Sequence, residues 1–211
     1  HERVSELLLR HGAEVNLQRS DGSTALMRAA YNGHERVGDL LIRYGAEVNP
    51  QDSDGDTPLM LAALQRHERV VDLLIRHGAE INLKDSDGCT ALMRAAGNGC
   101  EQVVELLIRH GAEVDLQSCV GNTALMSAAY RGHPAIVLRL LRAGADAAAR
   151  TNKGNTALQL AKEKGHAECV RVIEEHASAE AAAEAAAREA ERAVAEAQAA
   201  RHAEALLAEE E

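Results

Sequence analysis

Histidines, cysteines and aspartates are the residues of this chain whose side chains could bind metals or transfer protons, and there are ten histidines and four cysteines. Nine of the ten histidines recur at two fixed positions of a repeating pattern, and His202 is the exception. Side chains one repeat apart do not converge on one point as zinc ligands must. Cys89 and Cys119 fall in neighbouring turns, but two thiols do not complete a tetrahedral site. We therefore expect no metal site.

The carboxylates give no stronger signal for catalysis. Asp52, Asp54 and Asp56 form a dense group, but they occupy ordinary turn positions and lack the spacing of an EF-hand calcium loop. The sequence contains no phosphate-binding glycine loop, nucleophile elbow or helical zinc-protease motif. We expect a non-enzymatic protein with no cofactor and no small-molecule substrate.

The elements that position these residues follow a period of thirty-three. Five glycines are equally spaced, and each is followed by a threonine two residues later and by a leucine four residues later. A fixed period of this length indicates stacked repeats rather than one globular core. The five glycines are Gly22, Gly55, Gly88, Gly121 and Gly154.

One unit, residues 55–87, shows how the elements are built. Gly55 marks a turn, and Thr57-Pro58 reads as the N-cap and first residue of a short helix. A second helix is expected between His67 and His77, with Val70, Val71, Leu73, Leu74 and Ile75 buried. Gly78 can end that helix in the left-handed conformation.

This pattern resembles the ankyrin repeat, whose signature is G-x-T-P-L-H-x-A-A-x-x-G-H followed by V-V-x-L-L-L-x-x-G-A-D-V-N. The resemblance implies an all-α fold in which each repeat has a hairpin-like turn and two antiparallel helices. The repeats would stack into a curved solenoid whose stability is a sum over neighbouring interfaces. The match recurs in every unit up to about residue 176.

Several residues depart from the pattern. Methionine replaces the family's histidine in four units, which would remove a threonine–histidine hydrogen bond and substitute a flexible apolar side chain. Arg66 replaces a helix-ending glycine, at a cost of about 1–2 kcal/mol if the position needs the left-handed conformation. Cys100 stands at a histidine position, and Arg139 stands at a leucine position.

The register predicts an array over residues 1–176 and a tail over 177–211. His1 aligns with the start of a second helix, so we expect a fragment of a longer array. Glu174 and Ala177 replace an apolar residue and the closing glycine, as a polar capping repeat would require. The predicted units are a half repeat at 1–21, full repeats at 22–54, 55–87, 88–120 and 121–153, and a cap at 154–176.

The tail has nine acidic residues, three basic residues and seventeen alanines in 35 positions, which predicts a long Ala/Glu-rich helix. Val194, Leu206 and Leu207 are its only large apolar residues, too few for a heptad seam. We interpret it as a solvated spacer, and an alanine-based coiled coil is the alternative. The array is expected to be monomeric, with self-association possible through the tail.

Charge and composition narrow the partners. The net charge is −10 and no basic stripe is present, which argues against nucleic acid. No run of about eighteen apolar residues occurs, which argues against a membrane span. The cysteines lack C-x-x-C spacing, so free thiols and an intracellular location, in the cytoplasm or the nucleus, are expected.

The resemblance implies that turn residues and the ends of the first helices line a concave groove for a protein partner. We expect Tyr31 and Tyr130 to bracket this groove, with Leu64 between them, and a partner of mixed charge. The function predicted is a protein-interaction scaffold. The alternatives are a regulatory or targeting segment of a larger multidomain enzyme or signalling protein, and a structural spacer without a specific partner. The candidate residues are Ser20, Asp21, Ser23, Ser53, Asp54, Asp56, Ser86, Asp87, Cys89, Asn122 and Asn155 in turns, Tyr31, Asn32, Leu64, Gln65, Gly97, Asn98, Tyr130 and Arg131 at helix ends, and Arg28 and Arg94 within helices.

Overall fold

A computed structural model describes the backbone of residues 2–209 and the side chains of residues 2–196 and 198. This described part of the chain contains helices and no strand. Two compact units divide it, His1–Ile173 and Glu174–Glu211.

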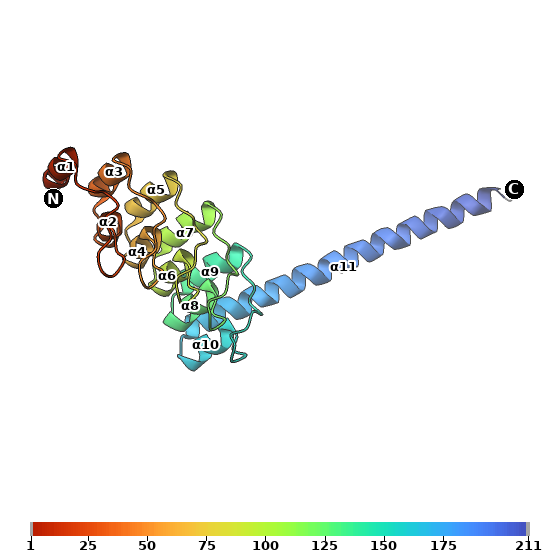
Figure 1. Ribbon diagram of the computed structural model, residues 1–211. Helices are drawn as coiled ribbons and strands as arrows, with labels where there is room; N and C mark the ends of the chain where they lie inside the picture. Colours follow the sequence, from red (N-terminus) through yellow and green to blue (C-terminus); the bar gives the residue numbers. More distant parts are fainter. Residues whose placement is uncertain (1, 210–211) are drawn as a thin grey trace. The chain divides into compact units, whose positions relative to one another are not determined.

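The first unit consists of two rows of helices, which Figure 1 shows as two stacked layers. Each helix packs on the next helix of its own row, and the two helices of one repeat also pack together. The first-row helices are α2 (Ala25–Tyr31), α4 (Pro58–Leu64), α6 (Ala91–Gly97), α8 (Ala124–Arg131) and α10 (Ala157–Glu163). The second-row helices are α1 (Glu2–Arg10), α3 (Glu35–Arg43), α5 (Glu68–Arg76), α7 (Glu101–Arg109) and α9 (Pro134–Arg142).

Threonine begins each first-row helix, as the sequence predicted. In α4 the Thr57 side chain accepts a hydrogen bond from the Met60 backbone N–H at 3.2 Å. Methionine was expected to remove the hydrogen bond between the threonine and the family's histidine. In α2 part of this contact remains, because the Met27 sulfur accepts a weak hydrogen bond from the Thr24 N–H at 3.4 Å. Gln159 in the last repeat makes the stronger version, accepting from the Thr156 N–H at 2.9 Å.

The core is built from alanine and aliphatic residues. Ala62 and Ala63 of α4 are fully buried, and so are the alanine pairs of α6 and α8. Because alanine is small, the first-row helices can approach one another closely while leucines and methionines fill the space between rows. In α5 the expected Val70, Val71, Leu73 and Leu74 are buried, whereas Ile75, also expected to be buried, is only partly so.

The turns between repeats form a ladder along one edge. The Ser53 N–H donates to the Asp21 carbonyl at 3.0 Å, and the same bond recurs one repeat later from Ser86 to Asp54. Gly55 has a positive φ of 79°, and a Cβ there would lie 2.7 Å from the backbone nitrogen of Ser86. Gly55 is therefore required both by its conformation and by the closeness of the next turn, as are Gly22, Gly88 and Gly121, whereas Gly154 is required by its conformation alone.

Histidines at the start of second-row helices join neighbouring repeats. The His67 ring nitrogen lies 3.0 Å from the Tyr31 carbonyl oxygen, and His166 is similarly placed 3.0 Å from the Tyr130 carbonyl oxygen. Each ring packs against the glycine that follows the first-row helix of the preceding repeat, so that a Cβ at Gly132 would lie 2.6 Å from the His166 ring. These histidines therefore have structural roles, and we name each such glycine–histidine contact a Gly–His junction.

One junction is built differently. Arg66 has the left-handed φ of 63° that the glycine pattern predicted, and Cys100 stands where a histidine would be. The Arg66 guanidinium donates to the Asn98 carbonyl, and the buried Cys100 sulfur lies 3.7 Å from the Ala63 carbonyl oxygen. The smaller cysteine leaves room for the arginine Cβ.

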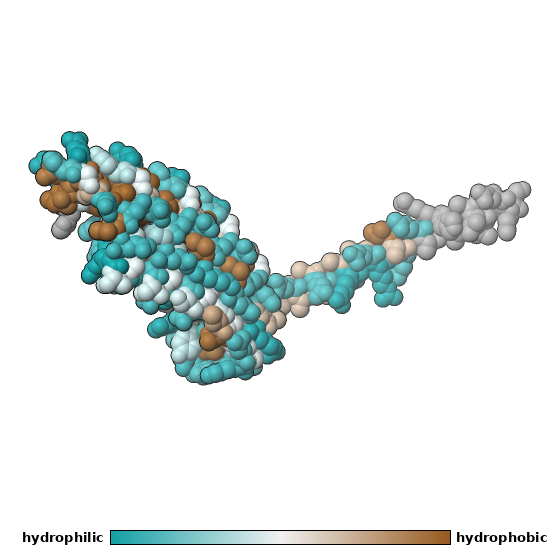
Figure 2. All heavy atoms as spheres, viewed as in Figure 1, coloured by the Kyte–Doolittle hydropathy of each residue, from teal (hydrophilic) through white to brown (hydrophobic). Residues whose placement is uncertain are grey.

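Apolar residues of α1 remain exposed. Val4, Leu7 and Leu8 have exposed fractions of 62%, 59% and 56%, whereas the matching residues of α5 are buried by α4. Figure 2 shows the corresponding hydrophobic surface at the end of the unit that contains α1. Within the described residues no first-row helix precedes α1.

Helix α11 (Ala167–Glu209) begins within the first unit and forms the second unit. The predicted continuation of the helix past Ala177 is confirmed. From residue 177 to 196 every side chain is exposed, and the expected Glu184–Arg188 ion pair forms at 2.6 Å. The side chains of His202, Leu206 and Leu207 lie outside the described residues.

Candidate protein-binding surface

Most predicted turn residues lie on the surface. Ser20, Asp21, Ser53, Asp54, Ser86 and Asp87 are exposed, and Asp56, Cys89, Asn122 and Asn155 are half-buried. Ser23 differs, because it is only 7% exposed and its hydroxyl donates to the Asp21 carboxylate at 2.6 Å. Its side chain serves the turn itself, and no sequence signal pointed to this role because the neighbouring repeats carry different residues at that position.

The hydrogen bonds from Ser23 also act on Asp21. Both its hydroxyl and its backbone N–H donate to the carboxylate, and they lower the pKa of Asp21. Asp21 therefore stays ionised on the exposed turn. With Asp54 and Asp87, it gives three successive turns an acidic outer edge.

Helix-end residues form a second line of candidates. Tyr31 and Tyr130 are 40% and 42% exposed, and each ring lies near a cation. The Arg28 guanidinium lies 5.9 Å from the Tyr31 ring centre, and the Lys164 ammonium lies 4.7 Å from the Tyr130 ring centre. These contacts orient the two rings while leaving part of each accessible.

The remaining residues at the helix ends differ along the array. The side-chain amides of Asn32 and Asn98 donate to carbonyls of their own helices and so help to end them. Gln65 is half-buried and Arg131 is exposed. This position therefore changes from amides in the first three full repeats to a cation in the fourth.

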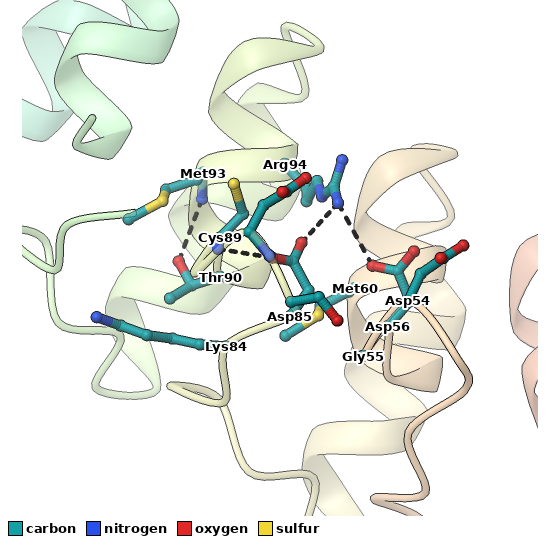
Figure 3. A network of polar contacts seen from close by, with 12 residues as sticks. Asp54, Gly55, Asp56, Met60, Lys84, Asp85, Cys89, Thr90, Met93 and Arg94 are labelled. Carbon is teal, nitrogen blue, oxygen red and sulfur yellow. Dashed lines mark hydrogen bonds and ion pairs between the residues drawn. The ribbon is translucent and has the colours of Figure 1, made fainter. Parts of the chain in front are cut away.

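Arg94 ties two acidic turns together (Figure 3). Its guanidinium lies 2.5 Å from the Asp85 carboxylate, in the turn that leads into its own repeat, and 3.6 Å from the Asp56 carboxylate of the turn before that one. The Asp85 side chain is 1% exposed and also accepts the N–H groups of Asp87 and Cys89 at 2.9 and 2.8 Å. Asp85 was not among the predicted residues, although its place at the start of an acidic turn was a usable signal.

Burial and neighbouring charges act on this network. Burial raises the pKa of Asp56, although the Arg94 charge opposes the change. Burial, followed by the negative charge of Asp85, raises the pKa of the Cys89 thiol. The cysteine is thus held in its neutral, less nucleophilic form beside the groove.

A groove of about 430 Å³ lies on helices α4, α6, α8 and α10. It brings together predicted residues from three repeats, but Tyr31 does not line it, so the two tyrosines do not bracket one hollow as expected. The predicted residues lining it are Leu64, Cys89, Arg94, Gly97, Asn98, Asn122, Tyr130 and Arg131. Met93, Met126, Ser127 and Leu160 also line it, whereas the methionines were expected only as apolar filler in the core.

The described residues offer little for other kinds of site. They contain no group of three or more histidine, cysteine, aspartate or glutamate side chains that could hold a metal ion. All four cysteines are free. None of the described helices is both long enough and apolar enough to cross a membrane.

Two rows of helices joined by a ladder of turns define a repeat solenoid, a class whose members bind along extended surfaces. The family model for ankyrin repeats (3 copies) matches residues 1–85, 71–151 and 92–185. The chain belongs to the ankyrin repeat family. Ankyrin repeats are generally protein–protein interaction modules and are typically non-catalytic. No curated protein matches the chain.

Proposed function

We propose that the repeat array is a scaffold that binds a protein partner along the turns and the ends of its first-row helices. The groove on α4, α6, α8 and α10 is the observation that carries this proposal. It combines an accessible tyrosine, an exposed arginine and two methionines, which are residue types enriched at protein interfaces.

The charge along this surface supports a partner of mixed charge. Asp21, Asp54 and Asp87 directly precede the glycines that open the first three full repeats, whereas Arg131 and Lys153 both lie in the fourth. A partner with opposite charges at its two ends would be held in one orientation, because the reversed orientation would place like charges together.

The test uses the two exposed tyrosines of the first row. Proteins that bind saturably to the tagged chain are first captured from an extract of the source organism. The affinity of such a partner is then measured for the wild type and for the double variant Tyr31→Ala/Tyr130→Ala. We expect at least tenfold weaker binding and an unchanged melting temperature, since neither tyrosine is buried.

Tyr44→Ala is the matched control. Tyr44 is 41% exposed, like the other two tyrosines, but it lies at the end of second-row helix α3. Its removal should leave binding intact. Equal binding by the double variant and the wild type would contradict the proposed surface.

A further inference from the structure

The groove exists because two neighbouring positions carry small residues. Along the ends of the first-row helices, residues thirty-three apart read Tyr31, Leu64, Gly97, Tyr130 and Glu163, so the large side chain is missing only at Gly97. Three residues earlier in each helix, the row reads Arg28, Leu61, Arg94, Ser127 and Leu160, and serine is the small member. Gly97 and Ser127 both line the groove.

Neither backbone geometry nor packing requires glycine at position 97. The chain has sixteen glycines, all within its described part, and fourteen of them have positive φ. Of the other two, Gly38 is confined because a Cβ there would lie 3.3 Å from a Leu73 methyl group, whereas at Gly97 the nearest atom would be 3.8 Å away. Glycine is also a poorer helix former than alanine. The helix thus keeps a less stable residue where a larger one would fit.

We call the part of the groove over Gly97 the hollow. The residues around it indicate which kind of side chain it would accept. Leu64 and Tyr130 stand on either side of position 97 in the row, and Met93, Met126 and Leu160 add apolar atoms. The adaptable methionines suit an aliphatic side chain of variable shape. A buried aliphatic side chain would gain contacts on several sides at once.

The charge of the lining is one-sided. Arg94 and Arg131 are its only charged residues. Arg94 is already paired with Asp85 and Asp56, whereas Arg131 makes no ion pair with any residue that the structure describes. Lys164 adds a further cation beside Tyr130, although Glu163 pairs with it. A carboxylate is therefore the complementary group at the Arg131 side of the hollow.

We propose that the hollow over Gly97 accepts one aliphatic side chain of a peptide segment in the partner, and that a nearby carboxylate of the same segment pairs with Arg131. This inference rests on the proposed protein-binding function and specifies the chemistry that the surface recognises. The peptide would carry leucine, isoleucine or methionine with aspartate or glutamate a few residues away.

The probe is a library of random twelve-residue peptides displayed on phage and selected on the full chain. The expected enriched sequences contain an aliphatic residue close to an acidic one. Selected peptides are then synthesised with a fluorophore, and their dissociation constants are measured by fluorescence anisotropy.

Gly97→Leu fills the hollow and should weaken peptide binding by roughly 10- to 100-fold, the range expected when one aliphatic side chain is no longer buried. Its melting temperature should not fall, because leucine favours helix, a Cβ at position 97 would have no atom nearer than 3.8 Å, and the groove lies beside it. Gly97→Ala is the matched control, since it also replaces glycine with a better helix former but its side chain occupies little of the hollow. Ser127→Leu fills the hollow from α8, where Leu160 stands one repeat later, and tests the same idea if the first variant has a folding defect.

Arg131→Glu tests the charge. It should weaken the binding of acidic peptides by about fivefold.

Each outcome separates this inference from the proposed function. Loss of binding by Gly97→Leu and Ser127→Leu, with Gly97→Ala close to wild type, supports the inference. Normal binding by both leucine variants overturns it, and the proposed function survives if Tyr31→Ala/Tyr130→Ala still weakens binding of the natural partner. Enrichment of basic peptides, or of none that prefer the wild type over Gly97→Leu, overturns the inference as well.

Discussion

The Gly–His junctions and the Arg66–Cys100 junction solve the same packing problem with different pairs of residues. At Gly33, Gly99 and Gly132, the absence of a Cβ lets a histidine ring close over the end of the preceding helix. At Arg66 a side chain occupies that space, and the residue opposite is a cysteine instead of a histidine. An irregular residue in a repeat is thus best understood together with its counterpart one repeat later.

The largest expected effect comes from mixing the two solutions at one junction. Gly132→Arg would force a non-glycine residue into a φ of 76° and place its Cβ 2.6 Å from the His166 ring. Strain and overpacking together should lower the free energy of unfolding by about 3 kcal/mol. Urea denaturation followed by circular dichroism measures this change. A loss below about 1 kcal/mol would show that the ring moves aside easily.

A smaller effect is expected when the irregular junction is half restored. Cys100→His would place a ring against the Arg66 Cβ and should destabilise the chain by about 1–3 kcal/mol. In Arg66→Gly/Cys100→His the ring has room, and the double variant should lie within about 1 kcal/mol of the wild type. It gains by relieving the left-handed arginine and loses the hydrogen bond from Arg66 to the Asn98 carbonyl.

The double-mutant cycle decides whether the two residues are matched. A coupling free energy near zero, with the two single effects simply adding, would mean that Arg66 and Cys100 diverged independently. Chemical denaturation of all four proteins under one set of conditions provides the measurement.

The smallest effect tests whether matching extends to the turns, where Arg94 faces Asp85 and Asp56. Because the pKa of Asp56 is raised above 3.8 in the folded chain, ionisation of this carboxyl opposes folding. The contribution of Asp56 to the free energy of unfolding is therefore most favourable below pH 3.8, and this contribution is lost as the pH rises through the raised pKa. Asp56→Asn should therefore increase stability at pH 7 by less than about 1 kcal/mol, and the gain should disappear near pH 3.

Asp54→Asn provides the comparison for that substitution, since it removes the same charge from an exposed position two residues away. Denaturation midpoints of both variants across pH 3 to 7 would reveal the difference. If Asp56→Asn destabilises the chain at pH 7, the attraction between Arg94 and Asp56 outweighs the desolvation of the carboxylate.

The repeating part of the fold could be predicted because its residues recur. Thr57, Pro58 and Gly78 specify helix ends through local rules, so a single sequence suffices to place them. The continuation of α11 past Ala177 likewise follows from local helix propensity. The partnership of Arg66 with Cys100 was not predicted, because it depends on the proximity of residues 34 positions apart in the sequence.

The candidate surface was predictable only in outline. The sequence indicated which positions face the groove, and eight of the candidates line it together. It did not show that Ser23 turns inward, that Asp85 is buried under Arg94, or that Tyr31 lies away from the groove. Ser23 bonds within its own turn, at a position whose residue differs in every neighbouring repeat, and the burial of Asp85 depends on Arg94, nine residues later.

The ladder of turns also has a mechanical consequence. Each rung is one backbone hydrogen bond, such as the one from Ser86 to the Asp54 carbonyl. The glycine beside it already lies so close to the next turn that the two turns have no room to move closer. We therefore expect the turn edge to resist both stretching and shortening, so that bending occurs mainly between the second-row helices. If tension pulled the array apart one repeat at a time, every thirty-three-residue unit would release the same length of chain, about 11 nm when fully extended.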